Sequence, residues 1–488
     1  MSSDPATAIW SATEVFQARH EKSAGALIAV QSALRSGRLA GERTSEFFSL
    51  YRFCVELPNW IFTRVWCEPG AYAWVRVAYD LVGHLRHGGE LPSQACAYLK
   101  ALAGENPAAW LPRHLEEFAP FALAGAVLAG RPLHLQRAYR ARLPLALPGT
   151  SIQLTGEGSV RIKGYRPGAL LIANEEGTRF TLRLHSGAEA GGVHVIEDPQ
   201  LDCGANRIRL SSAPFNLPGF EFAAQVLPSD AAYHRRHLPL LRAAFEHVAR
   251  HHPETYAQMG ASLRVIGLKP YGRGDFTNMT HSDLPGAFVL SVVENPWELA
   301  DTIIHEFHHN RLFFIEEDSP FFADPDQDAA SDEQYYSPWR DDLRPLTGVL
   351  HAVYVHLPVC DYWASVLQTS GVERSVRACA LDRLTRYPRQ IAVGLQQLRR
   401  FGRVTEAGHA LLEQLEQRLG QVRRRLAALP AAEKIPAYLV DANGKIVVQK
   451  RADTGAPMSV LEALQEHRRR CDTLQQCRDA DFDQLPAA

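Results

Sequence analysis

The sequence predicts an α+β protein that is mostly helical, with a flanking antiparallel β unit. Apolar residues recur at helical spacing before about residue 130 and again after about residue 228. Between these regions, over residues 133–227, short β-branched stretches alternate with Gly, Asp and Asn, which is typical of antiparallel strands. The 488 residues are 46% hydrophobic and 22% charged, enough for about three structural units with a substantial core.

Charge and apolar content exclude several classes of protein. Lys and Arg number 52 and Asp and Glu 54, so the chain lacks the strongly basic character of nucleic-acid-binding proteins. The most apolar run, Phe118–Gly130, is interrupted by Pro120 and is shorter than the roughly 20 residues of a membrane-spanning helix. The first ten residues show no signal-peptide pattern, and the eight cysteines form no CxxC pair. We therefore expect a cytoplasmic protein with free thiols.

The first half of the chain divides into two predicted regions. Residues 1–130 form an N-terminal helical region, in which Pro and Gly separate segments such as 47–54 and 72–82. Residues 131–227 form a β-rich unit. Its expected strands are residues 151–155, 160–163, 169–173, 180–184 and 193–196.

The second half of the chain divides into a predicted metal-site domain and a C-terminal hairpin with a helix. Residues 228–430 form the predicted metal-site domain. A helix over Pro239–His251, with the proline in its first turn, precedes strands over Ser262–Leu268 and Ala287–Val293. Long helices follow, and one carries a core-facing leucine stripe between Leu411 and Leu426. Residues 431–488 form a hairpin around an Asn-Gly turn and a last helix over Ser459–Gln476.

The chemically informative motif is HExxH, with His305, Glu306 and His309. Asn295 is a good helix N-cap and Pro296 a good first residue, so the motif is expected inside a helix. Residues four apart lie one turn apart on one helix face, where two imidazoles can hold one divalent metal ion. The sequence therefore predicts a zincin-like HExxH helical core with a metal site, in which His308 lies off the ligand face.

The third ligand is left open by the motif. The metalloprotease extension is absent, since Leu312 and Ile315 replace its glycine and third histidine. Glu333, in an acidic segment, is a weak candidate. A buried helix over residues 347–355 carries His351, with His356 just beyond it. These two differ by about 140° around the axis, so at most one of them should face the metal.

Two arginines precede that helix. Arg340 and Arg344 either form a salt-bridged loop with Asp341 and Asp342 or clamp a carboxylate through their guanidinium groups.

The order of these motifs resembles a known enzyme family. HExxH at 305–309, then Ser-Pro-Trp-Arg-Asp-Asp-x-Arg-Pro at 337–345 and Gly-x-Leu-His at 348–351, is similar to the HExxH-type peptide β-hydroxylases. These are iron(II)- and 2-oxoglutarate-dependent enzymes that modify ribosomally made peptides. The resemblance covers residues 280–370 best, and no motif extends it to residues 1–130 or beyond 430.

The resemblance implies a set of roles. His305 and His309 match the motif's metal ligands, and the downstream histidine ligand falls on His351, with His356 as the alternative. Arg340 and Arg344 match arginines that would hold the 2-oxoglutarate carboxylate. The implied cofactor is Fe(II), the cosubstrate 2-oxoglutarate, and the partner a ribosomally synthesised precursor peptide.

Glu306 separates this interpretation from its main alternative. In a zinc metallopeptidase it would be the general base that acts on metal-bound water, and Zn(II) would be retained. In an oxygenase it would orient a ligand or a water instead. A third hypothesis, a peptide-binding scaffold with a degenerate site, predicts that loss of His305 changes neither turnover nor metal content.

Overall fold

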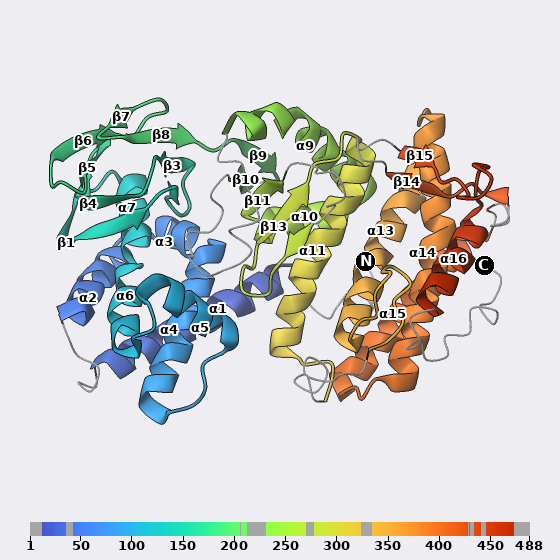
Figure 1. Cartoon of the computed structure of the whole chain (residues 1–488), viewed down its shortest axis with the longest axis horizontal. Helices are drawn as coiled ribbons and strands as arrows, with labels where there is room; N and C mark the ends of the chain where they lie inside the picture. The colour runs from blue at the N-terminus through green and yellow to red at the C-terminus, as the bar shows by residue number, and fades with distance from the viewer. Residues whose placement is uncertain are drawn as a thin grey trace.

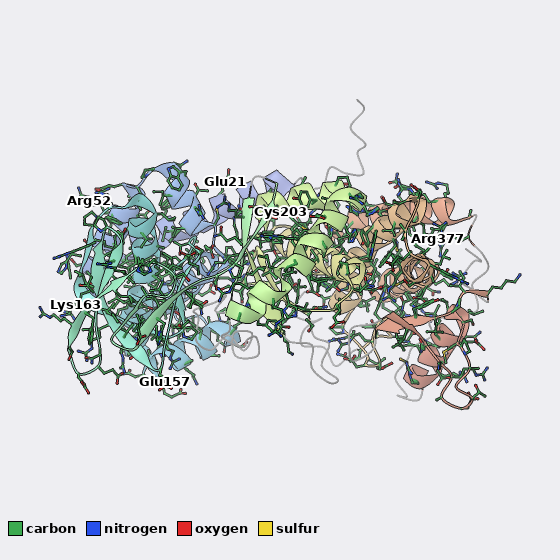
Figure 2. All side chains as sticks on the ribbon, turned by 90° about the horizontal axis from the view of Figure 1, so that it is seen from above. Glu21, Arg52, Glu157, Lys163, Cys203 and Arg377 are labelled. Atoms are coloured by element: carbon green, nitrogen blue, oxygen red, sulfur yellow. The ribbon has the colours of Figure 1, made fainter. Side chains whose placement is uncertain are left out.

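The computed structural model describes residues 12–35, 42–204, 206–211, 231–269, 278–323, 334–427, 429, 434–440 and 446–472. The predicted fold class is confirmed, because the protein is α+β, mostly helical, with antiparallel and mixed sheets. The N-terminal helices and the β unit lie at one end of an elongated molecule and the C-terminal helices at the other (Figures 1 and 2). None of the helices in the described ranges is both long and apolar enough to cross a membrane.

The N-terminal region is a helical cluster built around aromatic residues. Phe47, Trp74 and Phe118 are almost completely buried, and the Trp74 ring stacks on His114 with ring centroids 4.9 Å apart. Such contacts bury large apolar areas, which is what holds short helices together. The helices are α1 (Ala12–Arg35), α2 (Glu42–Val55), α3 (Asn59–Trp66), α4 (Pro69–His87), α5 (Ser93–Ala103), α6 (Trp110–Glu116) and α7 (Ala119–Ala129), with a 3-10 turn, η2 (Pro107–Ala109), before α6.

The β unit packs on these helices and shares one hydrophobic core with them. It consists of two antiparallel four-stranded sheets, in the orders β1-β4-β5-β6 and β2-β3-β8-β7. Buried and exposed residues largely alternate along β1, the pattern of a strand with one solvent-facing side. The strands are β1 (Leu133–Arg142), β2 (Leu145–Ala146), β3 (Ile152–Thr155), β4 (Ser159–Arg166), β5 (Ala169–Ala173), β6 (Arg179–Arg183), β7 (Glu189–Ala190) and β8 (Val193–Glu197).

A mixed sheet in the order β12-β13-β11-β10-β9 occupies the middle of the molecule (Figure 1). Its inner strands β10, β11 and β13 run parallel. Strands β9 and β10 fall in the segment that the sequence assigned to the β-rich unit, yet they belong to this sheet. The strands are β9 (Gln200–Cys203), β10 (Asn206–Leu210), β11 (Val265–Lys269), β12 (Met279–Thr280) and β13 (Ala287–Ser291).

Helices α9 (Ala231–His251), α10 (Pro253–Ser262) and α11 (Pro296–Asp318) pack near this sheet. The expectation that α9 begins at Pro239 was wrong, because the helix begins at Ala231 and the proline lies inside it. A proline in a helix interior removes one backbone donor, and burial of residues such as Leu241 and Phe245 offsets that loss. Helix α11 carries the HExxH motif and begins at Pro296, as predicted.

The remaining helices are α13 (Leu346–Gln368), α14 (Arg374–Phe401) and α15 (Glu406–Leu426). They share a second hydrophobic core with α11 and the mixed sheet. The leucine stripe of α15 is buried in this core, as predicted. Strands β14 (Tyr438–Val440) and β15 (Ile446–Val448) form the predicted antiparallel pair, whereas their Asn-Gly turn lies outside the described residues. Helix α16 (Val460–Asp472) follows.

A buried carboxyl joins the helical region to the β unit. The Tyr139 hydroxyl donates to Glu117 Oε2 at 2.7 Å, and burial raises the pKa of Glu117 from 4.5 to about 7. Because the folded pKa is the higher one, the contribution of Glu117 to stability is full below pH 4.5 and is lost as the pH rises through 7.

We expect Glu117→Gln to remove up to about 3 kcal/mol of this pH dependence, since glutamine accepts the Tyr139 bond without ionising. Urea unfolding between pH 4.5 and 8 measures it, with the exposed Glu105→Gln as control. Equal pH profiles for wild type and Glu117→Gln would contradict the assignment.

Gly394 lets α13 and α14 approach closely. A Cβ at this position would lie 2.5 Å from Val353 Cγ2 and 3.3 Å from the Trp339 ring. Gly394→Ala should therefore lower the free energy of unfolding by about 1–3 kcal/mol through overpacking. The control is Gly420→Ala in α15, whose Cβ would meet only Arg424 Nη1 at 3.7 Å and which should be neutral or stabilising. The urea midpoints of the two variants should move apart, and identical midpoints would refute the packing argument.

Candidate metal centre

Helix α11 places the motif between the mixed sheet and α13. The Asn295 side chain accepts hydrogen bonds from the backbone N–H groups of Trp297 and Glu298, which caps the helix as predicted. Apolar residues of α11, among them Ile303 and Ile304, are fully buried in the core. The two motif histidines lie on the side of α11 that contacts α13.

His305 and His309 face each other through their ligand atoms. Their Nε2 atoms are 3.1 Å apart and their ring centroids 4.7 Å apart. Two ligand nitrogens of one ion, each about 2.0–2.1 Å from it and separated by an angle of 90–109°, are roughly 2.9–3.4 Å apart. The pair therefore fits two neighbouring positions on one metal ion.

Burial keeps both rings neutral at neutral pH. It lowers the pKa of His305 to about 4 and that of His309 well below its ordinary value. A neutral imidazole has a lone pair to donate, and this is the form that binds metals.

His351 contacts the pair from behind His309. Its Nδ1 lies 3.0 Å from His309 Nδ1, and its Nε2 lies 2.8 Å from Glu316 Oε2. The carboxylate can only accept, so the neutral form of His351 donates from Nε2 and accepts at Nδ1 from His309. This chain, Glu316–His351–His309, leaves the lone pair of His309 on Nε2, toward His305. Both nitrogens of His351 are engaged, so its geometry favours an orienting role.

His356 approaches the pair from the other side. Its ring lies 4.9 Å from that of His305, edge to face. Nδ1 donates to the Ala352 carbonyl oxygen at 2.7 Å, which leaves Nε2 as the lone-pair nitrogen, and burial lowers the pKa of this histidine well below its ordinary value. Trp339 stacks on one face of the ring and Tyr387 meets it edge-on. The resemblance favoured His351 as the third ligand. In the structure, His356 rather than His351 has a nitrogen available for that role.

Both candidate histidines of α13 therefore contact the motif, one at each end of the pair. Within the described ranges, no three His, Cys, Asp or Glu side chains stand close enough together to enclose a metal ion. The geometry provides a close pair of imidazoles and, in ring contact with His305, a third imidazole.

Glu306 points to the mixed sheet. Thr280 Oγ1, on edge strand β12, donates to Glu306 Oε2 at 2.6 Å, and burial raises the pKa of this carboxyl group to about 7. His308 lies off the ligand face, as the helical angles predict, and hydrogen-bonds with Thr255 of α10 at 3.0 Å.

The predicted cosubstrate arginines lie on the surface. Arg340 Nε lies 2.9 Å from one oxygen of Asp342, and Arg344 Nε lies 3.4 Å from the other. The salt-bridged loop is therefore present with Asp342, whereas Asp341 pairs instead with Arg470 of α16 at 3.2 Å. Glu333 lies outside the described residues.

Three partners of the site were missed from the sequence. Glu316 lies seven residues after His309, two turns along the same helix face, and that spacing could have pointed to it. Arg383 of α14 is nearly buried and pairs with Glu298, two turns before the motif, at 2.8 Å. Trp363 of α13 donates to Asp301, one turn before His305, at 2.7 Å. The last two partners come from other helices and carry no local signal.

Neither models of known protein families nor curated proteins give a match to this chain.

The geometry predicts that the four histidines contribute differently to metal affinity. His305→Ala and His309→Ala should weaken Zn(II) or Fe(II) binding by more than about 100-fold, whereas His351→Ala should weaken it by about 10–100-fold, as loss of an orienting partner does. His356→Ala should resemble the motif variants. Equilibrium dialysis measures this, with exposed His409→Ala as control. A loss in His351→Ala as large as in His305→Ala, with none in His356→Ala, would make His351 the ligand.

Proposed function

We propose that the protein is an iron(II)- and 2-oxoglutarate-dependent dioxygenase that hydroxylates the β-carbon of a residue in a ribosomally made peptide. The proposal rests on one observation: the Nε2 atoms of His305 and His309 lie 3.1 Å apart, and the His356 ring contacts that of His305. A face of three imidazoles leaves positions of an octahedral iron open for cosubstrate and dioxygen. The order of motifs from HExxH to the histidine helix supports the same reaction.

The residues of the chain would hold the ion and set its surroundings. Iron(II) with 2-oxoglutarate supplies the oxidising power for C–H hydroxylation. His305, His309 and His356 would hold the ion, and the Glu316–His351 pair would fix the ring orientation of His309. Such orienting hydrogen bonds raise the basicity of a ligand and reduce its freedom to rotate.

Aromatic side chains border the histidines on several sides. Trp339 and Tyr387 pack on His356, and the Phe313 ring lies 4.5 Å from that of His351. Apolar walls of this kind keep bulk water away from a reactive centre. Arg340 and Arg344 remain the proposed ligands of 2-oxoglutarate, and binding it would exchange the carboxylate of Asp342 for that of the cosubstrate.

A zinc metallopeptidase is the alternative, and one observation favours it. Glu306 directly follows His305, and the general base of this reaction occupies that position of the motif. Its carboxylate is, however, hydrogen-bonded to Thr280. In the oxygenase, Glu306 acts by holding α11 against β12. Under both hypotheses the protein is a cytoplasmic enzyme that acts on a peptide.

Adding 2-oxoglutarate to the anaerobic, iron(II)-loaded protein tests the proposal without a substrate peptide. Chelation of iron by a 2-oxo acid should give a visible charge-transfer band. The band should be lost in His305→Ala and kept in exposed His409→Ala.

If no band forms and the protein retains zinc tightly, the oxygenase proposal fails. Hydrolysis of peptides by the zinc form, abolished in Glu306→Gln, would then establish the metallopeptidase.

A further inference from the structure

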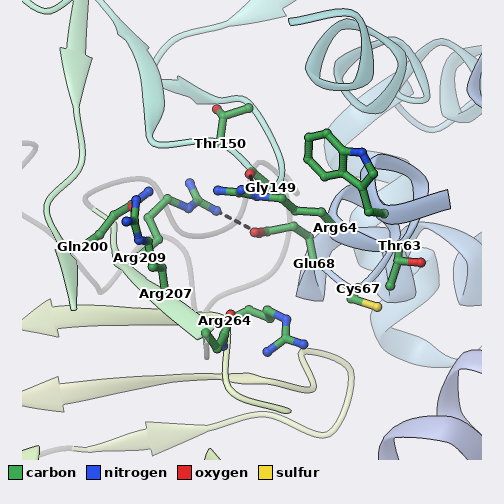
Figure 3. A pocket seen from close by; sticks show the side chains of 12 residues that line it. Thr63, Arg64, Cys67, Glu68, Gly149, Thr150, Gln200, Arg207, Arg209 and Arg264 are labelled. Atoms are coloured by element: carbon green, nitrogen blue, oxygen red, sulfur yellow. Dashed lines mark hydrogen bonds and ion pairs between the residues drawn. The ribbon is translucent and has the colours of Figure 1, made fainter. Parts of the chain in front are cut away.

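A pocket of about 480 Å³ lies where the N-terminal helices, the β unit and the mixed sheet meet. It shares no lining residue with the histidine site. Figure 3 shows Arg64 entering it from α3 and Arg209 from β10 on the opposite side. The volume is in the range of small-molecule sites. Among its lining residues are Trp60, Arg64, Glu68, Arg207, Arg209 and Arg264.

Arg209 is the buried cation of this pocket. Its side chain is 5% exposed and pairs with Glu68 at 2.9 Å and Asp198 at 3.5 Å. Its Nε is buried as well and has no hydrogen-bond partner among the described residues. A buried N–H without a partner is costly, so an acceptor in the pocket would be stabilising.

Two further arginines are held by backbone oxygens. Arg64 Nε donates to the Gly149 carbonyl oxygen at 2.7 Å, and Arg264 donates to Leu263 and Ala261. A guanidinium carries five N–H donors, so one bond to Gly149 leaves four on the terminal nitrogens of Arg64. Burial lowers the pKa of Arg264, which means that its charge is poorly solvated there.

The backbone at Gly149 lies unusually close to Arg64. Gly149 has a φ of +73°, and a Cβ there would lie 3.0 Å from the Arg64 carbonyl oxygen. Glycine therefore allows the loop after β2 to approach α3. Trp60 lies at the pocket with 58% of its surface exposed, beside Arg64 on the same helix. An exposed tryptophan next to an arginine is typical of binding sites.

The lining holds four arginines against one carboxylate, that of Glu68. Asp198 and Asp202 offset part of this charge by pairing with Arg209 and Arg207. Arginine forks match the oxygens of carboxylates and phosphates. We propose that this pocket binds a small organic anion through a carboxylate or phosphate group, with Arg64 and Arg209 as its main ligands.

The test is calorimetric titration of the metal-free protein with inorganic phosphate and, separately, with succinate. Saturable binding of one probe identifies the anion class. Arg64→Gln should weaken it by about 10-fold or more, because one charge-assisted contact is lost. Arg52→Gln is the matched control. This arginine lies on the outer surface of the N-terminal region, where its side chain is 81% exposed (Figure 2).

Three outcomes would overturn the proposal. One is that neither probe binds saturably, which would leave the arginines as a clamp between the N-terminal helices and the sheet. A second is equal affinity in Arg64→Gln and Arg52→Gln. His305→Ala should bind the probe as wild type does, and the third outcome is a loss there, which would place the anion at the histidines instead. The result is independent of the proposed function, since no residue is shared.

Discussion

The hydrogen-bonded chain from Glu316 through His351 to His309 is the constraint on which the site depends. It joins helices α11 and α13, and it decides which nitrogen of His309 carries the lone pair. If His309 were turned over or protonated, its Nε2 would no longer face that of His305 as a ligand. The same three side chains therefore connect α11 to α13 and orient the His309 ring.

The buried carboxyl groups of α11 have their partners on other helices, because burial requires each charge to be compensated. Arg383 of α14 lies between Glu298 and Asp301 of α11, and Trp363 of α13 satisfies Asp301 as well. Removing one member of such a network leaves an uncompensated buried charge, which is more costly than the net value of the pair. The same network holds α11, α13 and α14 in register, and so determines how His356 of α13 meets His305.

The HExxH helix was predictable because its signals lie within its own sequence. Features that depend on contacts with distant segments were not predictable. The Asn295 cap and the apolar stripe gave α11 its start and its buried face, and the helical angles placed His308 correctly. Sheet membership could not be predicted, because β10 pairs with β11, more than fifty residues later in the chain, and β9 joins the sheet through β10. The start of α9 was missed because Pro239 is tolerated in its interior. The choice between His351 and His356 depends on partners, Glu316 and the Ala352 carbonyl, that spacing alone does not reveal.

The central claim is that His305 and His309 share one metal ion. Anomalous diffraction from crystals loaded anaerobically with iron(II) tests it most directly. The account predicts a peak within about 2.0–2.2 Å of Nε2 of both histidines, with His356 as a third neighbour. A peak on His351 instead of His356 would reassign the third ligand and leave the claim intact. Iron bound elsewhere in the chain, with these two rings still in direct hydrogen-bond contact, would contradict it.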